Sequence, residues 1–474
     1  MRSIQRRVLV APRLLADCLD VIRFHLGTSK IPDGPIDLQR PYLSEEDIPP
    51  AIQLAILSLE ILAADESILT PGQPNLRVKE DIEKNWAGIS SWLEWLCTNM
   101  IIAGPQSNYM FFCQSRVHIA VFNTVETVLI RFQLRAQIVT NSSLLVLLWR
   151  IWLLEPTMVE NYARFHRMTP STMDWIIGDR SFSRLVLDVA VENGQIIESN
   201  HFRHAEIRDI LQDSEVVVAV AIQHIAQSTY ATKPPSYVSL NADFGLLSTL
   251  VRHPPLLQPF LRKEVSDTVL GVCAFLTRRS TLSSTDSLWS TSSALIAALE
   301  FLSFAVQSGV HPTINCIDSG LLIILMKCGR VLWKKEKYRA HALSGNPAAP
   351  NHGTVVREVL TKLERYLEVI IPLITIRAVM RRMQKSVKHI RAHNLEPLML
   401  ARPETELLSK HWDLMIQFLD GVQKVYDTYF ANAVGGLYNN VCSNEVRSRA
   451  IMRWTSTHAK RLPIPIEARR TLGT

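Results

Sequence analysis

The chain has 474 residues, of which 47% are hydrophobic, and its formal net charge is +7 at pH 7. This length suggests about two or three domains and allows a sizeable core. Glycine is scarce at 18 residues, and valine and isoleucine recur at helical rather than alternating spacings, which argues against a large sheet.

The seven cysteines are scattered without close pairs, and their odd number argues against a secreted disulfide framework. Cys97, Cys113, Cys273 and Cys328 lie within apolar helical patterns. We therefore expect buried, reduced thiols.

The N-terminal segment is basic, with Arg2, Arg6, Arg7 and Arg13 and no acid among its first sixteen residues. This pattern favours a first helix with a basic exposed face, over about residues 12–26, and an organelle-targeting helix is the alternative. We recognise no signal peptide, so we expect an intracellular protein, either cytoplasmic or nuclear.

Apolar residues at steps of three and four predict amphipathic helices along the N-terminal half. Two stripes run through Ile48, Ile52, Ala55, Ile56, Leu59 and Leu62, and through Ile82, Trp86, Ile89, Leu93 and Leu96. A long helical segment is expected over 108–139. The apolar run 144–154 is interrupted by Arg150 and ended by Glu155 and Pro156. It is shorter than the roughly 20 apolar residues that span a bilayer, so we expect a buried core helix.

Further helices are predicted over 207–230, 257–278, 285–309, 312–342, 354–395 and 404–431. Lys233-Pro234-Pro235 is the best candidate boundary. It predicts an N-terminal lobe (1–232), a C-terminal lobe (236–434) and a tail (435–474).

The clearest helical stripes lie in the C-terminal half. They are formed by Leu408, Trp412, Met415, Leu419, Val422, Tyr426 and Tyr429, and by Leu288, Leu295, Leu299, Leu302 and Val306. Helix pairs recur loosely about every 40 residues, as in armadillo and HEAT repeats. The sequence therefore predicts an all-α, armadillo/HEAT-like irregular helical array, α-solenoid-like, with no substantial sheet.

No local catalytic motif is present: the chain lacks the glycine-rich phosphate loops, G-x-S-x-G, H-E-x-x-H and C-x-x-C. We therefore predict no catalytic residue, no cofactor site and no metal site. His201 and His204, like His389 and His393, could share a helix face, but neighbouring cations oppose a metal ion. Exposed histidines are the favoured interpretation.

Tryptophans form two clusters, Trp86 with Trp92 and Trp95, and Trp149 with Trp152. Each lies in an amphipathic or apolar segment, which favours core packing. A hot spot for a binding partner is the alternative.

Positive charge is concentrated in residues 329–393, which hold fourteen cations and four acids, a net charge of +10. Arg377, Arg381, Lys385 and Lys388 follow at steps of four, four and three, so they would share one helix face. They are the candidate face for an anionic partner, and a solvated surface is the alternative. Aromatic residues are too few for a single-strand stacking platform.

A resemblance rests on the tryptophan-bearing last helix around His411 and Trp412, and on the run from Tyr438 through Cys442 to Asn444. These features resemble the uncharacterised helical proteins of mushroom-forming fungi that often end in a MYND-type zinc finger. The resemblance implies a helical scaffold whose relatives look like interaction proteins. No cysteine follows Cys442, and only His458 follows it among histidines, so no zinc site is carried over.

These observations predict a non-catalytic scaffold for protein–protein interaction, with protein partners, no cofactor and no membrane. Two alternatives stay open. One is binding of nucleic acid or another polyanion through the basic region 329–393. The other is an enzyme with a dispersed site between helices.

Overall fold

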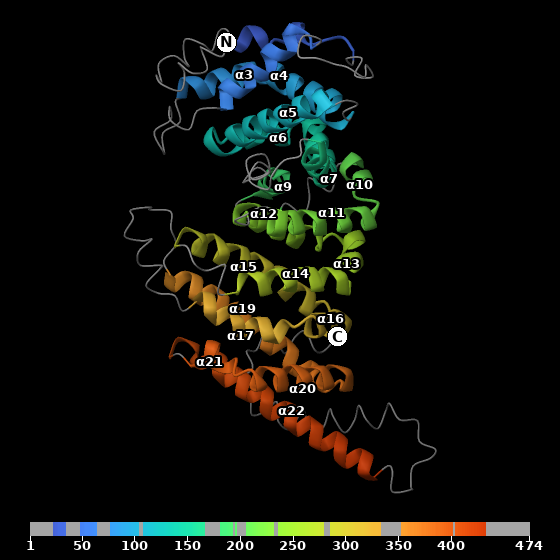
Figure 1. Cartoon of the computed structure of the whole chain (residues 1–474), viewed down its shortest axis with the longest axis vertical. Helices are drawn as coiled ribbons and strands as arrows, with labels where there is room; N and C mark the ends of the chain where they lie inside the picture. The colour runs from blue at the N-terminus through green and yellow to red at the C-terminus, as the bar shows by residue number, and fades with distance from the viewer. Residues whose placement is uncertain are drawn as a thin grey trace. The chain divides into compact units, whose positions relative to one another are not determined.

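The computed structural model describes residues 22–34, 48–63, 76–103, 108–165, 181–192, 195–196, 205–231, 236–278, 285–332, 352–401 and 403–432. Nearly all of them lie in helices, which confirms the all-α prediction (Figure 1). The strands in these ranges are β1 (Val191–Glu192) and β2 (Gln195–Ile196), which form one short antiparallel hairpin. The armadillo/HEAT-like arrangement stays a prediction.

The chain divides into two compact units. Unit 1 holds Met1–Ala305 and Arg330–Glu358, and unit 2 holds Val306–Gly329 and Val359–Thr474. Within unit 1, helices on the two sides of the proline-rich break at 233–235 pack together, and the hydroxyl of Ser228 donates to the Asp243 carboxylate across 2.7 Å. The predicted lobes and tail stay predictions.

The N-terminal part of unit 1 consists of amphipathic helices whose apolar stripes face one another. Helix α3 packs on α5, and both α4 and α5 pack on α7. The residues of the two predicted stripes in this part are buried, as expected. The elements are η1 (Thr28–Lys30), α3 (Pro50–Ala63), α4 (Leu76–Leu96), η3 (Cys97–Ile102), α5 (Asn108–Glu126), η4 (Thr127–Arg131), α6 (Arg135–Val139) and α7 (Ser142–Phe165).

Among the described residues of unit 1, three helices end in π-helical turns, which the sequence did not predict. They are η3 after α4, η4 after α5, and η5 (Gln227–Ala231) after α11. In η3 the amide of Ala103 donates to the carbonyl of Thr98, five residues earlier, across 3.1 Å. The buried Gln114 side chain donates to the Ile101 carbonyl of the same turn at 2.7 Å. A side chain of α5 thus satisfies one carbonyl of this wide turn.

The rest of unit 1 is built on α9 packed against α7 and α12, and on α11 packed against α12, α13 and α14. The predicted helix 257–278 is two helices, since Arg262 adopts an extended backbone between α13 and α14. Its guanidinium pairs with both Glu215 oxygens of α11 at 2.5 and 2.6 Å. The elements are α9 (Phe182–Ala190), α10 (Ala205–Ile210), α11 (Ser214–Ala226), α12 (Tyr237–Leu250), α13 (Pro254–Phe260), α14 (Lys263–Leu276) and α15 (Thr285–Gln307).

The apolar run 144–154 lies in a helix, α7, that continues beyond Glu155 to Phe165 with Pro156 inside it. Proline lacks the N–H that would bond the carbonyl four residues earlier. That carbonyl belongs to Trp152, and the His224 side chain of α11 occupies it instead, at 2.9 Å.

Helix α7 is also the one helix, within the described ranges, whose length and composition would allow it to cross a membrane. The stretch is Ser142–Asn161, and 67% of its most apolar window is buried inside the fold. Leu148, Trp149 and Trp152 are all buried, as in a core helix.

Two further predictions are wrong in unit 2. The segments 312–342 and 354–395 were each predicted as one helix, and each contains a break between two helices. Gly320, with a φ of +97°, separates α16 from α17 in a left-handed conformation that favours glycine. The second break follows Pro372 and separates α19 from α20. The elements are α16 (Val310–Asp318), α17 (Leu321–Leu332), α19 (His352–Leu373), α20 (Arg377–Ala392), α21 (Glu396–Leu400), η7 (Pro403–Thr405) and α22 (Glu406–Asn432).

The stripe that the sequence predicts on α22 is buried. Leu408, Trp412, Met415, Leu419 and Val422 are all at most 4% exposed. The half-buried Tyr426 hydroxyl donates to the Thr375 carbonyl at 2.8 Å, in the turn between α19 and α20. Helix α22 packs on α20, and α20 on α16, so α20 lies between two helices of its unit.

Candidate functional sites

The four residues of the predicted anionic-partner face lie on α20. That helix buries Val379, Met380, Met383, Val387 and Ile390 against its neighbours. On the opposite face Arg381, Lys385 and Lys388 are exposed, and Arg377 in the first turn is half-buried. We call Arg381, Lys385 and Lys388 the cationic row.

The cations beside the row are neutralised within unit 2. Arg382 donates to Asp318 of α16 at 2.7 Å, and Arg391 donates to Glu396 of α21 at 3.4 Å. In the described part of the chain, the three side chains of the cationic row have no such partner. Helix α20 itself contains no acid. The uncompensated charge therefore lies along one line on the surface.

The remainder of the predicted basic region does not extend this surface. On α19 the exposed Arg357 and Arg365 alternate with Glu358, Glu364 and Glu368. The side chains of Arg330, Lys334, Lys335, Lys337 and Arg339 lie outside the described set.

The histidine pairs do not form a metal centre in the described ranges, which contain no group of three His, Cys, Asp or Glu side chains that could hold a metal ion. His389 and His393 are exposed and stack with their ring centroids 4.1 Å apart. His201 and His204 lie outside the described residues.

The predicted core residues are largely buried. Trp86, Trp92, Trp95, Trp149 and Trp152 are at most 9% exposed, in agreement with core packing. Cys97, Cys273, Cys316 and Cys328 are buried free thiols. Burial raises the pKa of both Cys97 and Cys328, the latter to about 12. The side chain of Cys113 is not among those described.

A buried polar cluster, which the sequence did not predict, lies within unit 1 around Glu155. Glu155 of α7 accepts the backbone N–H of Phe182, at the start of α9, at 3.0 and 3.3 Å. His118 Nε2 of α5 lies 3.4 Å from one Glu155 oxygen, and His224 Nδ1 of α11 lies 3.7 Å from the other. One carboxylate thus connects four helices.

A second carboxylate, Asp243 of α12, continues this cluster. It accepts hydrogen bonds from Ser183 and Ser228, while its Oδ1 atom has no partner. Burial raises the pKa of Asp243, although His224 and the two serine hydroxyls act in the opposite direction. The Ser183 hydroxyl also accepts the Trp152 indole N–H at 3.0 Å.

The groups of this cluster bind one another and the backbone, so the cluster has a structural role. His118, Glu155, His224 and Asp243 are each at most 7% exposed, so a substrate cannot reach them in this conformation. Most of their polar atoms already bind groups of the fold, which is the usual arrangement of buried polar groups. The cluster therefore holds α5, α7, α9, α11 and α12 in register.

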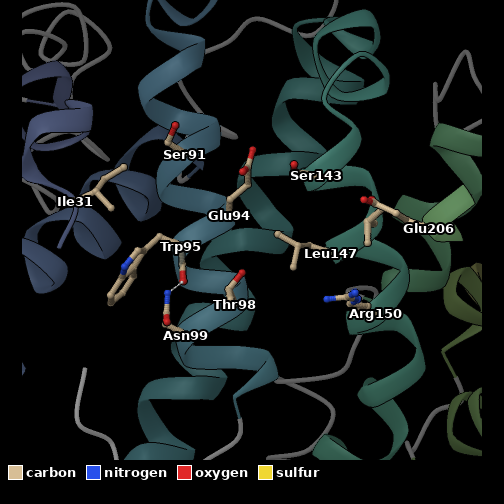
Figure 2. Close-up of a pocket in the computed structure, with 11 residues that line it drawn as sticks. Ile31, Ser91, Glu94, Trp95, Thr98, Asn99, Ser143, Leu147, Arg150 and Glu206 are labelled. Carbon is tan, nitrogen blue, oxygen red and sulfur yellow. Dashed lines mark hydrogen bonds between the residues drawn. The ribbon is translucent and has the colours of Figure 1, made fainter. Parts of the chain in front are cut away.

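An open groove lies between α4 and α7 and has a volume of about 510 Å³. Figure 2 shows that Ser91, Glu94, Trp95 and Thr98 line one side, and Ser143, Leu147 and Arg150 the other. Each set follows the three-four spacing of a single helix face. Ile31, Asn99, Val146 and, from α10, Glu206 complete the lining.

The groove combines apolar and charged groups. Trp95, Val146 and Leu147 are mostly buried beneath it, whereas Arg150 and Glu206 are exposed. Among the described residues, neither Arg150 nor Glu206 has a side-chain partner. Glu94 accepts an amide hydrogen bond from Asn141 at 2.8 Å. The sequence showed Arg150 only as an interruption of an apolar run.

The residues that carry the resemblance to the fungal helical proteins are only partly described. Trp412 is buried in α22, and Tyr438, Cys442 and His458 lie outside the described residues. No known family model, curated protein or solved structure matches this chain.

Proposed function

We propose that this chain is a non-catalytic helical scaffold that binds other proteins, and that the cationic row of α20 contacts an acidic segment of a partner. The observation that carries the proposal is the uneven pairing of charge on α20. Arg382 and Arg391 have acidic partners within unit 2, whereas Arg381, Lys385 and Lys388 have none among the described residues.

The spacing of the row suits a helical or extended acidic segment. Arg381 and Lys388 are seven residues apart, which corresponds to about 10.5 Å along the helix axis. Cations at steps of three and four repel one another by a few tenths of a kcal/mol per pair. Carboxylates at a matching spacing would offset this repulsion and set the register of the partner.

The charge on the neighbouring helix α22 favours a protein over a polyanion. Helix α22, which packs against α20, exposes Asp413, Asp420 and Asp427 at seven-residue intervals. A nucleic acid would carry many phosphates past these carboxylates, whereas a protein segment can alternate its charges. Binding of nucleic acid through the row is the second candidate.

The remaining polar features support a scaffold more than an enzyme. The polar cluster around Glu155 and Asp243 is enclosed and acts within the fold. The resemblance to fungal helical proteins points in the same direction, since those relatives look like interaction proteins.

Quantitative affinity purification of the full chain tests the proposal. We expect the triple variant Arg381→Glu/Lys385→Glu/Lys388→Glu to lose a defined protein partner that the wild type retains. The control Arg365→Glu/Lys424→Glu changes exposed cations of unit 2 outside the row and should retain it. An unchanged set of partners would overturn the role of the row, and loss of the same partners from the wild type after nuclease treatment would favour nucleic acid.

A further inference from the structure

We infer that the groove between α4 and α7 is a docking site for a short extended peptide of a partner protein, one that carries a basic residue and an acidic residue on either side of an apolar residue. This inference rests on the proposed scaffold role but concerns a different surface, in unit 1, from the cationic row of unit 2.

The dimensions of the groove suit a few residues of extended chain. Its walls run from Ser91 on α4 to Thr98 on η3 and from Ser143 to Arg150 on α7, and the seven residues of the α7 wall span about 10.5 Å. An extended chain advances about 3.3 Å per residue, so about three residues lie between the ends. The volume of about 510 Å³ accommodates side chains of that number.

The floor of the groove is apolar and its walls provide hydrogen-bonding groups. Leu147 lies on the α7 side of the groove in Figure 2 and can contact one apolar side chain of the ligand, whereas the Trp95 indole points away from Leu147. The hydroxyls of Ser91 and Ser143 can bond a peptide main chain. The Asn99 amide nitrogen donates to the Trp95 carbonyl at 2.9 Å, and its side-chain oxygen can accept a peptide N–H.

The charges define the two ends of the ligand. Figure 2 shows Glu94 and Glu206 toward one end of the groove and Arg150 toward the other, with Leu147 between them. Arg150 requires a carboxylate, and the two glutamates require a cation. Glu94 and Glu206 would repel a purely acidic ligand, and Arg150 would repel a purely basic one.

These charges also select against other occupants. A nucleic acid or an anionic membrane surface would bring phosphates against Glu94 and Glu206. The groove is open along its length, so it does not enclose a small molecule as a cofactor pocket does. A peptide with both signs of charge is the class that satisfies every lining group.

Selection from a random octapeptide display library on the immobilised full chain tests this inference. We expect wild-type protein to enrich peptides with a base and an acid separated by one or two apolar residues. The same selection on Arg150→Glu should replace the acid by a base. A peptide selected on the wild type should bind Arg150→Glu at least about tenfold more weakly by fluorescence anisotropy.

The control is Arg208→Glu, which reverses an exposed arginine on α10 outside the groove lining and should bind the peptide as the wild type does. Glu206→Lys is a second groove variant and should change the preference at the basic position. The inference is overturned if no consensus emerges, or if the selected peptides bind both groove variants as tightly as the wild type. The triple variant Arg381→Glu/Lys385→Glu/Lys388→Glu should still bind the peptide, because its changes lie outside the groove. The two proposals can therefore fail independently of each other.

Discussion

His224 donates a hydrogen bond from Nε2 to the backbone carbonyl of Trp152 at 2.9 Å. This carbonyl lacks its usual helical donor, because Pro156, four residues later in α7, has no N–H. Because a carbonyl only accepts, Nε2 carries the proton in this contact. The two rings also stack, 5.4 Å apart and within 4° of parallel. A side chain of α11 thus stabilises a proline within the core helix α7.

The first prediction concerns this replacement of a helical hydrogen bond. Changing His224→Leu should lower the free energy of unfolding by about 1–3 kcal/mol, since the Trp152 carbonyl is left buried without a donor. In a Pro156→Ala background the loss should be smaller, because the new N–H at position 156 can bond that carbonyl. Urea unfolding of the four proteins measures the coupling, and strictly additive losses would contradict the assignment.

The second prediction compares two helical glycines. A Cβ atom on Gly329 of α17 would lie 1.8 Å from the Leu398 carbonyl oxygen of α21, whereas one on Gly271 of α14 would meet no atom within 4 Å. We expect Gly329→Ala to cost about 1–3 kcal/mol through overpacking. Gly271→Ala should instead stabilise the protein by about 0.5–1 kcal/mol. Thermal unfolding checks both, and equal shifts would contradict the close approach.

The third prediction concerns pH. Burial raises the pKa of Asp243 above its ordinary value of 3.8, so the native state binds this proton more tightly than the unfolded state. Ionised Asp243 therefore costs stability increasingly as pH rises from about 4 through the raised value. Relative to wild type, Asp243→Asn should gain unfolding free energy over that window. A difference that does not change with pH would contradict this prediction. The control is Asp209→Asn, which changes an exposed carboxylate of α10.

The fourth prediction concerns thiol reactivity. Cys97, Cys273, Cys316 and Cys328 are buried, and a raised pKa keeps Cys97 and Cys328 protonated near neutral pH. Iodoacetamide should label none of the four in native protein at neutral pH and all four in urea, as peptide mapping would show. Rapid native labelling of Cys328 would mean that unit 2 opens more often than its packing indicates.

Periodicity was sufficient to predict which faces of the helices are buried. The α22 stripe from Leu408 to Val422 is buried because steps of three and four return to one face. Breaks were harder to predict, since they depend on distant partners: Arg262 at the α13–α14 break binds Glu215. The continuation of α7 through Pro156 could not be predicted for the same reason, because the compensating His224 is far along the chain.

The candidate sites were predictable only where one helix contains all the residues. Spacing alone placed Arg381, Lys385 and Lys388 on one face of α20. It could not show that Arg382 is neutralised by Asp318 while the row is not, because that pairing joins two helices. The groove was missed for the same reason, since Glu94, Arg150 and Glu206 come from three helices.

The last prediction tests the energetic cost of the cationic row. Lys385 follows Arg381 by four residues and precedes Lys388 by three, so Lys385→Gln removes two repulsions and should raise stability by a few tenths of a kcal/mol. Arg382→Gln, next to the row, should lower stability slightly, because it breaks the ion pair with Asp318. Both effects should shrink in about 0.5 M salt, since salt screens exposed charges.

Denaturant unfolding at low and high salt measures both changes, and a loss of stability in Lys385→Gln would show that the cations of the row do not repel one another measurably. A surface that costs stability is retained more readily when a partner uses it. The same Lys385→Gln protein should therefore be more stable than wild type yet bind the acidic partner of α20 more weakly. Greater stability with undiminished binding would leave the row without a role in recognition.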